Sequence, residues 1–209
     1  MKKLITTLAA AGALASTVAT SQAQIVVNGG PLTPVATPTS TGSGATVASQ
    51  SPTFSTGIQD GSLSSTVLSG DLLAPVGYTG YTFVYQVSET GSTTVNTISL
   101  DGYAGLGSVF VSIVPGTGAG VPDYAQLAGD TLTIDLFPNT PTGGSSDLIY
   151  VFTSADSYGV NGATADDGVS ANTTDLAPVP EPSTVMAGAL MILPLGFGAF
   201  RALRKERIA

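Results

Sequence analysis

The chain has 209 residues, of which only 10% are charged, and its formal net charge is −8. All six basic residues lie near the two ends, so no positive side chain occurs between Leu4 and Phe200. Nucleic-acid affinity comes largely from Lys and Arg side chains that neutralise phosphates, so this composition excludes a nucleic-acid-binding body. The chain has no histidine and no cysteine, which excludes Ser-His-Asp and Cys-His catalysis, the usual zinc ligands and disulfide bonds.

Residues 1–23 have the pattern of a secretory signal peptide. Lys2 and Lys3 form a charged start, residues 4–18 are mostly apolar, and Ser21-Gln22-Ala23 offers small residues at the cleavage positions. We therefore expect cleavage between Ala23 and Gln24.

Residues 24–53 are rich in Gly, Pro, Thr and Ser and contain few large apolar side chains. This composition favours turns and extended chain over packed structure. The sequence therefore predicts an extended N-terminal arm.

Residues 54–162 carry strand signals. In the best of them, 81–87, Tyr81, Phe83, Tyr85 and Val87 alternate with smaller or polar residues, which is the period of a strand with one buried face. The expected strands are 66–68, 81–87, 93–100, 108–114, 131–136 and 148–153.

Turn dipeptides such as Asp60-Gly61, Asp101-Gly102 and Gly143-Gly144 separate these runs. Several short strands joined by such turns, without helical periodicity, indicate an antiparallel β-sandwich over 54–162. A partly open barrel is an alternative. A β-solenoid is another, but the chain lacks the fixed repeat that a solenoid requires.

The reactive side chains between the two ends are carboxylates, hydroxyls and tyrosines. Two carboxylates facing each other could hydrolyse a glycoside, so a glycoside hydrolase is a distant alternative. Most aspartates stand beside glycine in turn sequences, however, and the chain has no tryptophan to line a sugar cleft. We expect a protein that is not an enzyme.

We expect no cofactor, with calcium as the one alternative, because carboxylates are the ligands that this hard cation prefers. The weak candidates are Asp156 with Asp166 and Asp167, or Asp123 with Asp130. No EF-hand spacing is present, so solvated surface charge is the simpler interpretation.

Four tyrosines could form a sugar-stacking patch, namely Tyr78, Tyr81, Tyr85 and Tyr103. Tyr81 and Tyr85 share their alternating face with Phe83 and Val87. We therefore expect core packing, with the hydroxyl groups at the rim.

Residues 163–178 again contain small and polar residues, and we expect a linker or stalk there. Residues 185–200 then form an uncharged apolar run of 16 residues, which as a helix would span about 24 Å. A basic tail over 201–207 follows, with Arg201, Arg204, Lys205 and Arg207. Basic residues remain on the cytoplasmic side of a span, so the bulk of the chain would lie outside.

Residues 179–209 combine the motif Val179-Pro180-Glu181-Pro182-Ser183-Thr184, the short apolar span 185–200 and the terminal basic cluster. In this order the three features resemble the PEP-CTERM sorting signal of exported bacterial proteins. The resemblance implies recognition and processing at this motif by a membrane-embedded exosortase, with transient anchoring in the inner membrane of a Gram-negative bacterium.

The resemblance further implies removal of the hydrophobic tail and delivery to the cell surface or extracellular matrix. We therefore expect an exported, non-enzymatic surface protein associated with exopolysaccharide or biofilm. A secreted module that binds carbohydrate or calcium is the alternative.

Overall fold

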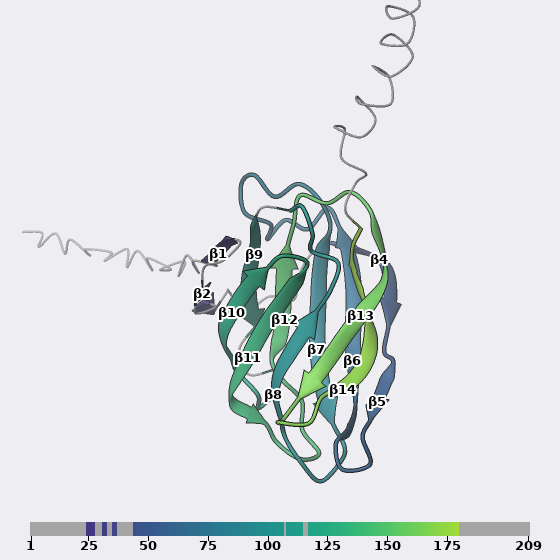
Figure 1. Ribbon diagram of the computed structural model, residues 1–209. Helices are drawn as coiled ribbons and strands as arrows, with labels where there is room; N and C mark the ends of the chain where they lie inside the picture. The colour runs from purple at the N-terminus through teal and green to yellow at the C-terminus, as the bar shows by residue number, and fades with distance from the viewer. Residues whose placement is uncertain are drawn as a thin grey trace, which may run out of the picture.

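The computed structural model describes residues 24–27, 31–32, 35–36, 44–106, 108–114 and 117–179. These residues form β-strands and connecting loops, and they contain no helix. The strands build two sheets that pack face to face as a sandwich (Figure 1).

The first sheet is built around the long antiparallel pair of β6 and β7. Its strands are, in spatial order, β1 (Gln24–Val27), β9 (Ser108–Val114), β12 (Leu148–Phe152), β7 (Thr82–Glu89), β6 (Asp60–Ser69) and β4 (Ala45–Gln50). Two short strands join it, β3 (Val35–Ala36) beside β9 in parallel and β5 (Thr53–Ser55) beside β6.

The second sheet ends on one side with the last described strand of the chain. Its order is β14 (Ala171–Pro178), β13 (Tyr158–Asp166), β8 (Val95–Leu100), β11 (Thr131–Thr140), β10 (Pro122–Ala128) and β2 (Pro31–Leu32). All of its strand pairs are antiparallel.

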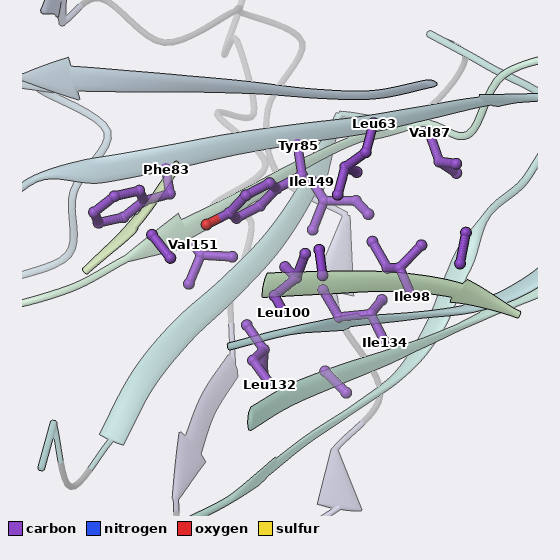
Figure 2. Close-up of a cluster of buried hydrophobic side chains, with 14 of the residues drawn as sticks. Leu63, Phe83, Tyr85, Val87, Ile98, Leu100, Leu132, Ile134, Ile149 and Val151 are labelled. Carbon is purple, nitrogen blue, oxygen red and sulfur yellow. The ribbon is translucent and has the colours of Figure 1, made fainter. Parts of the chain in front are cut away.

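The core lies between the inner faces of the two sheets (Figure 2). From the first sheet, β6, β7 and β12 contribute Leu63, Phe83, Tyr85, Ile149 and Val151. Facing them from the second sheet are Ile98, Leu100, Leu132 and Ile134 of β8 and β11. Alternate residues of each strand point inward, as expected for a sheet with one packed face.

The expected antiparallel sandwich is confirmed at this level. The alternation predicted for 81–87 is present in β7, where Phe83, Tyr85 and Val87 lie in the core. Val84 points to the outer face, where it belongs to a second cluster that also contains Leu68, Val114, Tyr150 and Phe152. Both faces of the first sheet are therefore partly covered.

The predicted stalk over 163–178 is wrong. These residues form the end of β13 and all of β14, and the two strands pair with each other from Tyr158↔Pro178 to Ala165↔Ala171. Ala163, Ala165, Ala171 and Ala177 are buried in the core, and the Leu176 N–H donates to Ser65 Oγ at 2.9 Å across to the first sheet. Small alanines give a weak hydropathy signal, but they bury as completely as larger residues where two sheets approach closely.

The predicted arm over 24–53 is also partly wrong, because 45–50 is strand β4 and β5 begins at Thr53. Both strands pair with β6. Polar strands of this kind are stabilised by backbone hydrogen bonding to a neighbour that the local sequence does not reveal.

The signal peptide predicted for 1–23, the motif residues 180–184, the span 185–200 and the basic tail 201–207 lie outside the described residues. Within the part of the chain that is described, no helix has the length and apolar character needed to cross a membrane.

The Leu176→Ala substitution tests whether β14 belongs to the fold. Leu176 is buried and packs in the core, so its truncation should lower the free energy of unfolding by about 2 to 4 kcal/mol. Val169→Ala, in the exposed β13–β14 turn, is the control and should change stability by less than about 0.5 kcal/mol. Urea denaturation followed by circular dichroism measures both, and equal effects would restore the stalk interpretation.

Candidate functional site

One end of the sandwich brings together the features that bear on function, and we call it the exit end. It consists of the β6–β7 connection, the β12–β13 connection and the C-terminal end of β14. These segments meet because β6 and β12 run toward this end and β7 and β13 run away from it, while β14 returns to it (Figure 1). Their backbones are joined by Gly80 N–H to Thr153 O at 3.1 Å and Tyr81 N–H to Ala155 O at 2.8 Å.

The last described residue, Val179, is fixed at the exit end by two hydrogen bonds to Ser157. The Val179 N–H donates to the Ser157 carbonyl at 3.2 Å, and Ser157 Oγ donates to the Val179 carbonyl at 3.0 Å. Val179 is also the first residue of the predicted sorting motif. The described fold therefore reaches the residue that directly precedes Pro180.

A shallow pocket of about 150 Å³ lies beside this exit. It is lined by Ser69, Gly70, Thr79, Gly80, Tyr81 and Asp156. The ring of Tyr81 is held edge-on by Tyr158, with centroids 5.3 Å apart and an interplanar angle of 88°. The pocket thus combines an aromatic ring, two hydroxyls and an exposed carboxylate, which are groups that recognise polyols.

The structure does not bring the calcium candidates together. Asp156 precedes β13 and Asp166 ends it, so roughly 27 Å of strand separates the two. Asp123 and Asp130 lie near opposite ends of β10. Among the described residues, no group of three or more acidic side chains is arranged to hold a metal ion.

Asp166 and Asp167 instead shape the β13–β14 turn. Asp166 accepts hydrogen bonds from the Gly168 N–H and the Ser170 hydroxyl, and Asp167 accepts from the Val169 N–H at 3.1 Å. Bonds to Ser170 and Gly168 favour the ionised carboxylate and lower the pKa of Asp166. These aspartates have the turn-forming role that their glycine neighbour indicates.

The four tyrosines separate into two groups. Tyr85 and Tyr103 are completely buried, whereas Tyr78 and Tyr81 are half-buried. Core packing is thus confirmed for Tyr85 and Tyr103, but the prediction that their hydroxyls reach the rim is wrong. Their oxygens lie 2.8 Å apart inside the sandwich, and the Tyr85 hydroxyl donates to the Leu176 carbonyl at 2.8 Å.

Asp175 of β14 lies beside these tyrosines and is the charged residue that the sequence interpretation missed. Its side chain has no exposed surface, and neither carboxyl oxygen has a hydrogen-bond partner among the described residues. The single Tyr85 proton is already donated to Leu176, so Tyr85 contributes a polar contact to Asp175 and no donated proton. A carboxylate in this position would be an uncompensated buried charge.

The protein avoids that charge by keeping Asp175 protonated. Burial raises the pKa of Asp175 to about 8, and the negative charge of Asp101 adds to the increase. Burial also raises the pKa of both Tyr85 and Tyr103 well above the usual value, with Asp175 nearby as a further cause. The inaccessible Asp175 cannot reach a solute, so its pair with Asp101 is unsuited to hydrolysing a glycoside.

A sequence signal for Asp175 exists but is weak. Ala171, Thr173, Asp175 and Ala177 alternate onto one face of β14, so the aspartate occupies an inward position. With alanine and threonine as its neighbours on that face, the strand has too little hydrophobicity to be recognised as buried.

No protein-family model matches the chain, and no curated protein or solved structure is detectably similar to it.

The raised pKa of Asp175 predicts that stability falls as pH rises. The folded protein retains a proton up to about pH 8 that the unfolded chain loses near pH 4, so stability is greatest below pH 4 and decreases through this window. The decrease should approach about 1.4 kcal/mol per pH unit. The lowered pKa of Asp166 has the opposite effect and makes stability increase as pH rises, but only in the acid range below the ordinary pKa of an aspartate.

Urea denaturation at a series of pH values between 5 and 8 measures this slope. The isosteric variant Asp175→Asn cannot ionise, so its stability should depend much less on pH. Asp123→Asn, on the exposed side of β10, should keep the pH dependence of the wild-type protein. A wild-type protein with constant stability across this range would contradict the assignment.

Proposed function

We propose that this protein is an exported, non-enzymatic sandwich that is delivered through the PEP-CTERM route to the cell surface or extracellular matrix. In this proposal the span 185–200 anchors it transiently in the inner membrane. An exosortase then acts at Val179 to Thr184, and the released body is associated with exopolysaccharide.

Supporting this proposal is the position of Val179 relative to the described strands. Val179 is bonded to Ser157, and every described strand precedes it. Cleavage within 180–184 would therefore remove none of these described strands and break none of the hydrogen bonds between β13 and β14. A processing site inside one of these strands would instead remove part of the sandwich.

The charge of the body supports a hydrated extracellular environment. Twelve acidic residues and no basic residue lie between Gln24 and Val179. A protein with this net charge stays soluble and repels other polyanions. Neutral polysaccharide is therefore a better neighbour for it than nucleic acid or an anionic polymer.

Intact-mass measurement of the protein from the extracellular fraction and from membranes tests the route. We expect the extracellular form to begin near Gln24 and to end between Val179 and Thr184, and the membrane form to retain the tail. Trypsin digestion is uninformative here, because no Lys or Arg occurs between Lys3 and Arg201.

A pair of variants separates processing from general secretion. Glu181→Ala removes the acidic residue of the motif and should strongly reduce the extracellular form, whereas Glu206→Ala removes the other tail carboxylate and should leave its amount unchanged. An extracellular form that still ends at Ala209, or equal release of both variants, would contradict the proposal.

A second candidate function is recognition of a neutral sugar in the pocket at the exit end. The Tyr81 ring can stack on a sugar face, while Asp156, Ser69 and Thr79 can hydrogen-bond to its hydroxyls. An anionic sugar fits poorly, because the pocket offers no cation and one carboxylate.

Calorimetric titration with neutral oligosaccharides of glucose, mannose and xylose tests this candidate. The full chain should be used in a detergent without a sugar headgroup, which could itself occupy the pocket. Asp156→Asn should weaken binding by roughly tenfold or more through loss of a charged hydrogen bond, whereas Asp123→Asn should not. Equal affinity of the two variants, or binding of none of these sugars, would exclude the pocket as a neutral-sugar site.

A further inference from the structure

The β6–β7 connection at the exit end is a loop shaped by two tight turns. In the first turn the Ala74 N–H donates to the Asp71 carbonyl at 3.1 Å, and Asp71 Oδ1 accepts from the Leu73 N–H at 3.0 Å. In the second turn the Tyr78 N–H donates to the Pro75 carbonyl at 3.0 Å. Gly77 supplies the positive φ of 98° that the third position of a type II turn requires, so Val76 lies at the tip.

The base of this loop is anchored to the outer face of the first sheet. Leu73, Ala74 and Tyr78 pack against the buried cluster that includes Phe152. The Tyr78 ring lies 5.5 Å from that of Phe110, and its hydroxyl is within 3.3 Å of Ser108 Oγ. The loop is therefore held in a definite position.

The tip of the loop presents apolar side chains to solvent. Val76 is fully exposed and Leu72 is 86% exposed, which makes them the two most exposed large apolar side chains of the described residues. The loop is uncharged from Leu72 to Gly80. An anchored loop with an apolar, uncharged tip has the composition of an interfacial membrane contact.

The tip lies at the end of the sandwich from which the chain leaves. Gly80 and Tyr81 hydrogen-bond to Thr153 and Ala155, and Val179 hydrogen-bonds to Ser157 a few residues further along the same connection. In Figure 1 the β6–β7 loop accordingly caps the upper end of the sandwich, together with the β12–β13 connection.

The connection to the expected membrane span is short. Residues 180–184 separate Val179 from the apolar run that begins at Val185. Fully extended, this segment reaches about 20 Å, and each polar layer of a bilayer is itself about 6 Å thick. While the tail spans the membrane, the exit end must face the bilayer at close range.

We propose that the β6–β7 loop inserts Leu72 and Val76 into the interface of the bilayer that holds the tail. This inference rests on the proposed membrane anchoring of residues 185–200. Two apolar side chains give only marginal membrane affinity alone, so the contact forms while the tail raises their local concentration. Removal of the tail therefore releases the loop together with the body.

The absence of cysteine from the chain permits a direct test with one label at a time. Full-length Val76→Cys carries an environment-sensitive NBD fluorophore and is incorporated into nanodiscs of phosphatidylethanolamine and phosphatidylglycerol. Val169→Cys carries the same label in the β13–β14 turn, at the opposite end of β13, and is the matched control. Both positions are exposed, so labelling should not disturb folding.

We expect the label at Val76 to shift its emission to shorter wavelength and to be quenched by nitroxide-labelled lipids. The label at Val169 should show neither change. Equal emission and quenching at the two positions, in a chain that co-elutes with nanodiscs, would overturn the loop contact while leaving membrane anchoring intact. A chain that does not co-elute with nanodiscs would overturn the anchoring and the loop contact together.

Discussion

The packing of two inner sheet faces against each other is the interaction on which this structure depends. The body has no basic residue and the chain has no cysteine, so neither ion pairs nor disulfides can hold the sheets together. Stability comes from apolar burial and from hydrogen bonds, which must be satisfied wherever a polar group enters the core. The cluster of Phe83, Ile98, Leu132 and Ile149 is the centre of that packing (Figure 2).

Asp175 places a carboxyl side chain inside this largely apolar core. An unpaired carboxylate in the core would cost several kcal/mol, and the protein avoids it by holding a proton on the side chain. Two buried tyrosine hydroxyls form the polar surroundings, with Tyr85 bonded to both Tyr103 and the β14 backbone. Together they tie β14 to β7 and make the last strand part of the core.

The attachment of β14 to the core determines where the chain leaves the sandwich. Because β14 is a core strand and the Val179 that follows it is fixed by Ser157, the sandwich reaches directly to the predicted sorting motif. The same end carries the pocket beside Tyr81 and the apolar tip at Val76. In the anchored state that we propose, both would face the bilayer, and release would expose both to the matrix.

The sequence alone determined the all-β class, the alternation of β7 and the turn role of Asp166 and Asp167, because these depend on local periodicity and turn chemistry. It also contains the pattern from which export and sorting are inferred. The tertiary structure alone decided that 163–178 contains the end of β13 and all of β14, that Asp156 lies far from Asp166, and that Asp175 is buried beside Tyr85 and Tyr103. These features depend on contacts between residues distant in the chain, for which small or polar residues such as Ala165 and Asp175 give almost no local signal.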